Sequence, residues 1–478
     1  MVKYFFFMNV SGLKVSMKSR IVLFILCLLG LVVPAIQAQR PADKMEWFKD
    51  AKLGMFIHWS VFSKIAGEWK GEQKYNEFVM LQAKIPIREF EPVAASFNPV
   101  DFDAEAWVLA AKRAGMKYIV YTSKHHEGFA MYHSKCSPYN IYDFTPFKRD
   151  PLAELAAACR KHGVKLGIYY SLGRDWHDPD VPTNWPTKGG RSNTWDFPDE
   201  DAKDINRYME RKAKPQIKEL LEQYNPDLIW FDTPDMTPKA QSIAIRKMIL
   251  DHNPNIIIND RIGNGQGDYR TVEQKKAGAI NRNPWEACIT MSRNWGYMKS
   301  DNDFKSSEKL IGLLIDTASK GGNLLLNVGP TPEGVIQERN LERMECIGRW
   351  LKTNGEAIYG SEPWKVYGEE AQQAEGAEVV REKGFEDAVY DATGAVAQDI
   401  RFTVNNGYLY VFARDWRTPE IRVQSLAGSA VKIESVKLLG CRKKVEWKQT
   451  DEGLSVRIPD KAKNDLNIYT LKVKLEEP

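Results

Sequence analysis

Short apolar or β-branched runs alternate with longer amphipathic stretches from about Leu53 onward. Such alternation is typical of parallel strands joined by helices, and it predicts an α/β fold closed as a (β/α) barrel of the TIM type. Seven strands can be assigned and an eighth cannot, which leaves a distorted or incomplete barrel as an alternative. The predicted strands are residues 53–59, 117–123, 165–171, 227–232, 255–260, 287–292 and 323–329.

The amphipathic stretches between these runs predict the helices that would cover the barrel. Several of them end at glycine or asparagine, the residues that most readily stop a helix. The predicted helices are residues 104–115, 151–163, 214–225, 240–253, 307–322 and 338–355.

The pattern changes after Trp364, where apolar and polar residues begin to alternate one by one, as in residues 399–416. Asn405-Asn406-Gly407 interrupts this segment as a hairpin turn would. Alternation of this kind at short spacing predicts an all-β sandwich. We therefore expect a catalytic barrel over residues 39–364 and a C-terminal β-sandwich over residues 365–478.

The N-terminus has the pattern of a signal peptide over residues 1–38. Lys14, Lys18 and Arg20 precede the apolar run 21–33, and small residues follow it. The run is shorter than the ~20 residues that span a bilayer, so no membrane span is expected. The pattern predicts a secreted or periplasmic protein. Lipid anchoring at Cys27 is disfavoured, because the residues before it are not the small ones that such processing requires.

Charge and cysteine content argue against several classes of protein. Lys and Arg number 67 against 63 Asp and Glu, and no long basic run interleaved with aromatic residues suggests a nucleic-acid groove. The cysteines beyond residue 38 are widely spaced, without a CxxC motif or a Cys/His cluster. Neither a metal site nor another cofactor is predicted.

Polar residues stand at the ends of successive predicted strands, where barrel enzymes place their active sites. Their recurrence at five strand ends predicts one site at the barrel mouth. The residues are His58, His125, His126, Tyr170, Asp232, Asp260 and Arg261.

Asp232 is the leading candidate for a catalytic carboxylate, because the apolar run 228–231 before it would hold it rigidly. A turn or helix-capping role is the alternative, supported by Thr233-Pro234. The consecutive histidines could bind hydroxyl groups or zinc. The chain has no HxH or HExxH motif, and adjacent strand residues face opposite sides, so one histidine could simply be packed.

Glycoside hydrolysis generally needs a second carboxyl group, and the chain offers three candidates. Glu286 precedes a predicted strand beside a tryptophan, Glu273 lies in a polar segment expected to be a loop, and Glu68 is more distant. A loop-borne acid is chemically acceptable, because it needs only to reach the glycosidic oxygen.

An ordered set of motifs resembles glycoside hydrolase family 29, the α-L-fucosidases. The resemblance covers nearly all of residues 44–365. The motifs are LGMFIHWSVFS, Gly67-Glu68-Trp69, TSKHHEGFAMYHS, LGIYYSLGRDW, PDLIWFD, NDR, PWEACITMSRNWGY and GGNLLLNVGPTPEGVI.

The resemblance implies an exo-acting, retaining α-L-fucosidase that forms a covalent fucosyl-enzyme and acts on fucosylated oligosaccharides or glycoconjugates. It makes Asp232 the nucleophile and a glutamate the acid/base, with Glu286 preferred and Glu273 the alternative. The implied sugar-binding residues are His58, Glu68, Trp69, His125, His126, Tyr170, Trp230, Arg261 and Trp295.

Two other functions compete with this interpretation. One is a retaining glycosidase of the same fold with another sugar specificity, since a fold does not dictate the substrate. The other is a carbohydrate-binding protein without catalysis, which the retained carboxylates disfavour. The sequence does not specify the fucosyl linkage, the aglycone, the oligomeric state or the role of the C-terminal domain.

Overall fold

The computed structural model describes residues 43–183, 191–369 and 399–476, except 415, 417 and 430. The predicted signal peptide, residues 1–38, lies outside these ranges. Within them, no helix is long and apolar enough to cross a membrane.

Eight parallel strands form the first sheet, in the order β7-β6-β5-β4-β1-β10-β9-β8. An isolated parallel bridge between Asn259 and Tyr269 joins the two outermost strands and completes the ring. The predicted TIM-like barrel is therefore confirmed. The strands are β1 (Leu53–Ile57), β4 (Tyr118–Lys124), β5 (Lys165–Ser171), β6 (Leu228–Asp232), β7 (Ile257–Ile258), β8 (Arg270–Glu273), β9 (Trp285–Thr290) and β10 (Asn323–Val328).

The strand that the sequence analysis could not place is β8. It holds only four residues, none of which is buried, so it lacks the apolar run that marks a core strand. Its neighbour β7 is shorter than predicted and has two residues. The barrel is thus closed by two short strands on this side. The segment that carries Glu273 is a strand rather than the expected loop.

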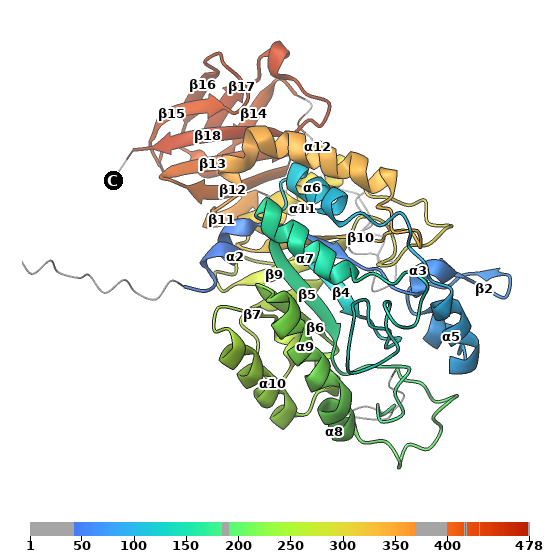
Figure 1. Ribbon diagram of the computed structural model, residues 1–478. Coiled ribbons are helices and arrows are strands. Elements are labelled where there is room, and N and C mark those ends of the chain that lie inside the picture. The colour runs from blue at the N-terminus through green and yellow to red at the C-terminus, as the bar shows by residue number, and fades with distance from the viewer. Residues whose placement is uncertain are drawn as a thin grey trace, which may run out of the picture. The chain divides into compact units, whose positions relative to one another are not determined.

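The six predicted helices are all present (Figure 1). Asp103, Asp150 and Ser306 each accept a hydrogen bond from the first turn of the helix that follows. Gly163 and Asn225 end two helices in the left-handed conformation. The helices are α6 (Ala104–Arg113), α7 (Pro151–His162), α9 (Lys214–Tyr224), α10 (Lys239–His252), α11 (Ser307–Ser319) and α12 (Glu338–Asn354), and the shorter ones include α2 (Glu46–Ala51), α3 (Phe62–Ile65), α4 (Val79–Gln82), α5 (Ile87–Ala95) and α8 (Ile205–Tyr208).

Two antiparallel sheets follow the barrel. The predicted hairpin turn is confirmed, since Asn406 and Gly407 both have positive φ and connect β12 to β13. The predicted boundary at residue 365 falls inside β11. One sheet contains β11 (Glu362–Glu369), β12 (Asp399–Asn405), β13 (Tyr408–Arg414), β18 (Tyr469–Leu475) and β15 (Ile433–Leu438), and the other β14 (Glu420–Val423), β17 (Gly453–Arg457) and β16 (Glu446–Thr450).

Candidate active site

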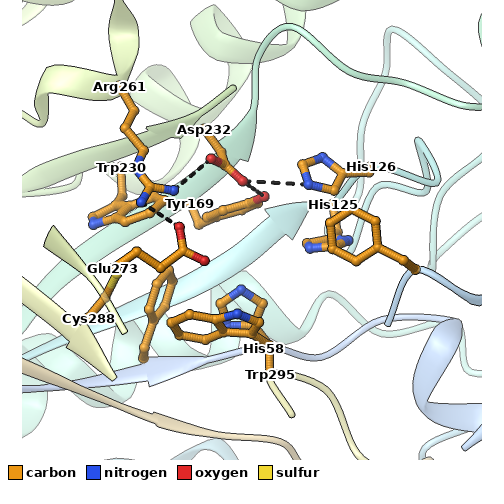
Figure 2. A pocket seen from close by; sticks show the side chains of 12 residues that line it. His58, His125, His126, Tyr169, Trp230, Asp232, Arg261, Glu273, Cys288 and Trp295 are labelled. Atoms are coloured by element: carbon orange, nitrogen blue, oxygen red, sulfur yellow. Dashed lines mark hydrogen bonds and ion pairs between the residues drawn. The ribbon is translucent and has the colours of Figure 1, made fainter. Parts of the chain in front are cut away.

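A pocket of about 320 Å³ lies at the carboxyl ends of the barrel strands (Figure 2). Several strands contribute to one concave surface, as expected for a barrel enzyme. The lining residues are Phe56, His58, Phe78, His125, His126, Tyr169, Trp230, Asp232, Arg261, Glu273, Cys288 and Trp295.

The pairing of β5 with β6 determines which tyrosine faces the pocket. Tyr169 is the register partner of Trp230, whereas Tyr170 is the partner of Phe231. Because side chains alternate along a strand, Tyr169 shares the pocket face with Trp230 and Asp232. Tyr170 is not among the lining residues, and its hydroxyl donates to Gln216 on α9.

Asp232 ends β6 and is held by three donors. Its Oδ1 accepts hydrogen bonds from Arg261 Nη1 at 2.9 Å and from the Thr233 amide at 2.8 Å. Its Oδ2 accepts one from the Tyr169 hydroxyl at 2.9 Å. Burial disfavours the charged carboxylate, but Arg261 and the other contacts outweigh it and hold the Asp232 pKa well below its usual range. Asp232 is therefore an ionised carboxylate at neutral pH.

Arg261 bridges Asp232 to the second carboxylate of the pocket. Its Nη2 donates to Glu273 Oε2 at 2.6 Å, while its Nη1 holds Asp232 (Figure 2). The Glu273 side chain is 34% exposed, compared with 18% for Asp232. Two carboxylates thus face the same pocket, and the more accessible one is Glu273.

His58 and His126 are neutral imidazoles, and the proton of His58 can be assigned. Asn327 Nδ2 donates to a backbone carbonyl, so its Oδ1 accepts from His58 Nδ1 at 2.7 Å. His126 Nδ1 lies 2.6 Å from the Ser171 hydroxyl oxygen, which is also 3.0 Å from the Arg174 carbonyl. Burial, assisted by His125, lowers the pKa of His58 to about 3 and places that of His126 well below its usual value. The Nε2 atom of His58 is left as an acceptor for hydroxyl groups, whereas His126 Nε2 lies 3.5 Å from Asp232 Oδ2.

His125 also lines the pocket, so both consecutive histidines belong to the site. They follow β4 in a turn rather than continuing it, and the strand alternation assumed for them does not apply. His125 Nδ1 lies 3.3 Å from Glu127 Oε2. The Ser60 hydroxyl donates to the other oxygen of Glu127, which fixes this carboxylate behind the histidine.

Glu286 lies in the barrel interior and does not line the pocket. Its side chain is fully buried and accepts hydrogen bonds from the Tyr118 hydroxyl at 2.5 Å and from Trp230 Nε1 at 2.9 Å. Burial raises the Glu286 pKa to about 7, against these two hydrogen bonds, which favour the charged form.

This pKa predicts that the free energy of unfolding depends on pH. The folded state binds the extra proton between about pH 4.3, the value for an unfolded glutamate, and about pH 7. The contribution of this proton to the free energy of unfolding is fully present below about pH 4.3 and is lost as the pH rises through about 7. The full difference in the free energy of unfolding is about 4 kcal/mol, of which about 3 kcal/mol falls between pH 5 and pH 8.

Urea unfolding at pH 5 and pH 8 measures this effect. Glu286→Gln cannot titrate and is the control. We expect the wild type to lose more stability than the variant between the two pH values, and equal losses would contradict the buried neutral carboxyl.

Glu68 and Trp69 form β2 (Glu68–Trp69), which pairs with β3 (Glu72–Gln73) as a small hairpin. Glu68 is exposed and bonds to Gln73, and neither Glu68 nor Trp69 lines the pocket. Trp69 lines a separate surface cleft with Tyr75 and Glu89.

The sequence analysis missed four lining residues. Phe56 lies two residues before His58, Tyr169 is the register partner of Trp230, and Cys288 is the register partner of Glu273. Strand alternation could have indicated these three once the register was known. Phe78 precedes a short helix and carries no comparable signal.

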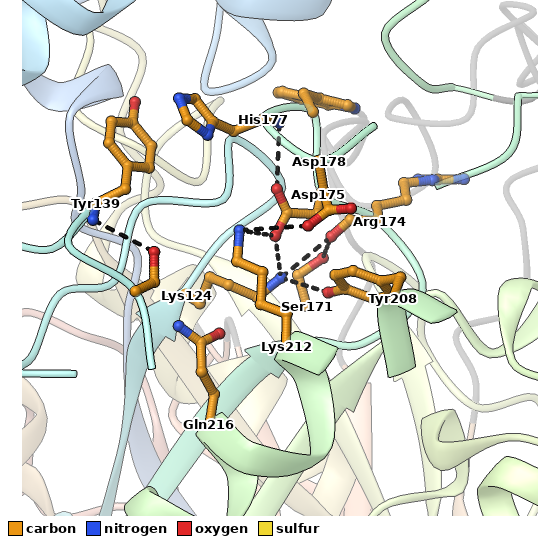
Figure 3. A network of polar contacts seen from close by, with 12 residues as sticks. Lys124, Tyr139, Ser171, Arg174, Asp175, His177, Asp178, Tyr208, Lys212 and Gln216 are labelled. Carbon is orange, nitrogen blue, oxygen red and sulfur yellow. Dashed lines mark hydrogen bonds and ion pairs between the residues drawn. The ribbon is translucent and has the colours of Figure 1, made fainter. Parts of the chain in front are cut away.

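A buried ionic cluster joins Asp175 to Lys124 and Lys212 (Figure 3). Asp175 is fully buried and pairs with Lys124 at 3.1 Å and with Lys212 at 2.7 Å. The neighbouring Trp176 amide donates to the His126 carbonyl at 2.7 Å. The cluster therefore fixes the backbone that holds a pocket histidine.

Replacing Asp175 with alanine would leave two buried ammonium groups without their shared carboxylate. We expect the free energy of unfolding to fall by about 3–5 kcal/mol. The control is Asp251→Ala, which removes an exposed pair with Lys247 and should cost less than about 1 kcal/mol. Denaturant titration of both variants measures the difference, and similar losses would contradict a stabilising cluster.

Comparisons with known proteins agree with this geometry. The α-L-fucosidase family model matches residues 33–356, and the α-L-fucosidase C-terminal domain model matches residues 393–474. The tissue α-L-fucosidase of Bos taurus is 30% identical over 439 residues, covering 86% of this chain and 84% of the relative. That of Mus musculus is 33% identical over 350 residues, covering 68% and 73%.

Solved structures extend the likeness to the fold. α-L-Fucosidase isoenzyme 1 from Paenibacillus thiaminolyticus matches with a TM-score of 0.77 and 32% identity, covering 91% of this chain and 99% of its own. AlfC from Lactobacillus casei, in complex with its α-L-fucose product, matches with a TM-score of 0.61 and 38% identity, covering 65% and 98%. With its barrel and its C-terminal domain both matched, the chain belongs to the α-L-fucosidase family, glycoside hydrolase family 29.

Proposed function

We propose that this protein is an exo-acting, retaining α-L-fucosidase in which Asp232 is the nucleophile and Glu273 the acid/base. The observation that carries the proposal is the pair of carboxylates joined by Arg261 within one pocket. Family membership indicates that the sugar is L-fucose, and the pocket contains the two carboxyl groups that glycoside hydrolysis needs.

In the first step, Asp232 Oδ attacks the anomeric carbon of fucose while Glu273 gives its proton to the glycosidic oxygen. The bond between that carbon and oxygen breaks, the aglycone leaves with the proton, and fucose becomes an ester of Asp232. The low pKa of Asp232 suits this role, because the nucleophile must be ionised.

In the second step, Glu273 takes a proton from water, and the water oxygen displaces Asp232 from the anomeric carbon. Two displacements on the same carbon return its original configuration. Arg261 stands between the carboxylates, so it can stabilise whichever one is charged.

Glu273 takes the acid/base role in this proposal, although the sequence favoured Glu286. An acid/base must reach the glycosidic oxygen and then water. Glu273 lines the pocket and is partly exposed, whereas Glu286 is fully buried and occupied by Tyr118 and Trp230.

Hydroxyl recognition would fall to the histidines. The Nε2 atom of His58 is an acceptor, and a monosaccharide presents hydroxyl donors to it, while His126 lies beside Asp232 at the same pocket wall. The aromatic rings of Trp230, Tyr169 and Trp295 complete the pocket and suit the apolar faces and methyl group of fucose. The N-terminal pattern supports a secreted or periplasmic enzyme acting on fucosylated glycans.

Hydrolysis of 4-nitrophenyl glycosides tests the proposed function. We expect kcat/KM for the α-L-fucoside to exceed those for the α-D-galactoside and β-D-glucoside at least about 10³-fold, because unmatched polar groups reject the wrong sugar. Asp232→Ala, purified identically, controls for contaminating activity. Equal rates on the three substrates would contradict the specificity, and no activity on any would contradict catalysis.

A further inference from the structure

Glu286 connects three strands that are not neighbours in the barrel. It projects from β9, and its two carboxyl oxygens accept hydrogen bonds from Tyr118 on β4 and Trp230 on β6. The buried carboxyl group therefore links aromatic side chains from two other strands across the barrel interior. Both of these hydrogen bonds are made away from the pocket, so any influence of Glu286 on the site would pass through a partner such as Trp230.

Trp230 contacts the two side chains that donate hydrogen bonds to the nucleophile. Its ring stacks on Tyr169 with centroids 5.5 Å apart and an interplanar angle of 23°. The Arg261 guanidinium lies 4.8 Å above the centre of the same ring. Tyr169 and Arg261 in turn bond the two oxygens of Asp232. A rotation of the indole would displace both contacts of the nucleophile.

The indole has a single hydrogen-bond donor, and Glu286 accepts it. Stacking restrains the plane of a ring but leaves it free to slide, whereas a hydrogen bond at Nε1 fixes the ring along its plane. Glu286 is thus the group that determines where the Trp230 ring lies beneath Arg261 and Tyr169.

We propose that Glu286 is a positioning residue that acts through Trp230 to orient Arg261 and Tyr169 around Asp232. The proposal rests on the proposed function of Asp232. It assigns a role to the glutamate that the sequence resemblance favoured as acid/base, and the two roles predict different behaviour.

The test compares Glu286→Gln with Glu286→Leu on 4-nitrophenyl α-L-fucoside. The Gln carbonyl can accept from Trp230 Nε1 and its amide can donate to the Tyr118 oxygen, so the geometry is preserved. Leucine removes both contacts. We expect kcat/KM to fall less than about 3-fold for Glu286→Gln and about 10–100-fold for Glu286→Leu, as for other groups that orient an active-site residue.

A double-mutant cycle with Trp230→Phe tests whether the loss of activity in Glu286→Leu is transmitted through the Trp230 indole. Phenylalanine lacks Nε1, so Glu286→Leu should cost less than about 3-fold in that background. A merely structural role would give the same loss in both backgrounds, and that result would overturn the proposal. If Glu286→Leu does not fold, Tyr118→Phe loosens the same anchor without loss of volume and replaces it in the cycle.

The pH profile provides a second readout. Arg261 holds the Asp232 pKa down, so displacing the guanidinium should move the acid limb of kcat/KM to higher pH in Glu286→Leu and leave it unchanged in Glu286→Gln. An unmoved limb in Glu286→Leu would overturn the proposal. So would inactivity of Glu286→Gln with rescue by azide, which would make Glu286 the acid/base. An inactive wild type would instead refute the proposed function.

Discussion

Replacing Asp232 with alanine is expected to lower kcat/KM on α-L-fucosides by about 10⁴-fold or more. The substitution removes the atom that forms the covalent bond, and no neighbouring group can replace it. The fold should persist, because Asp232 stands at a strand end and Arg261 keeps its bond to Glu273. Initial rates with purified protein, normalised to the folded fraction, measure the loss.

Azide should restore part of this activity, since a small anion fits the space vacated by the carboxylate. One displacement by azide would give a product of inverted configuration. The control is Asp235→Ala, which removes an exposed carboxylate three residues away and should change the rate less than about 2-fold. An Asp232→Ala protein with more than a few per cent of wild-type activity would contradict the assignment.

Replacing Glu273 with alanine is expected to affect poor leaving groups far more than good ones. A sugar must be protonated as it departs, whereas nitrophenolate can leave unaided. We expect activity on fucosylated oligosaccharides to fall about 10²–10⁴-fold and the first step on activated aryl fucosides to fall much less. Azide should accelerate the second step and give a fucosyl azide of retained configuration.

Glu286→Ala, assayed beside Glu273→Ala, discriminates between the two glutamates. Loss of a positioning group should slow both substrate classes alike, without azide rescue. If only Glu286→Ala shows leaving-group dependence and rescue, the assignment to Glu273 fails.

The apolar runs of the barrel were sufficient to predict seven strands and the residues at their ends. Asp232, Arg261 and the three histidines were found in this way, because a buried strand followed by a polar residue is visible in one sequence. The missing strand β8 has no buried residues, so hydrophobic periodicity could not reveal it.

Which face a side chain occupies was harder to predict. Tyr169 and Tyr170 are adjacent and chemically identical, and only the pairing with β6 decides which one faces the pocket. Glu273 and Glu286 differ in depth along the barrel, since their register partners are Cys288 and Thr271. The depth of each side chain depends on how β8 and β9 pair, and this register cannot be predicted from the local sequence.

The hairpin that carries Glu68 and Trp69 shows a further limit. The motif around these residues resembles the family, and the resemblance implied contact with the sugar. In the described hairpin Glu68 is exposed and neither residue lines the pocket, and their contact with the sugar stays a prediction. The resemblance identifies these two residues in the sequence, but their position relative to the pocket depends on the path of the backbone.

The most direct test of the two-carboxylate mechanism is proton NMR of the first sugar released from an aryl α-L-fucoside. Two successive displacements, through Asp232 and then water activated by Glu273, predict that α-L-fucose appears first and that the β anomer grows only by mutarotation. Initial appearance of β-L-fucose would contradict the covalent mechanism and the roles of both residues.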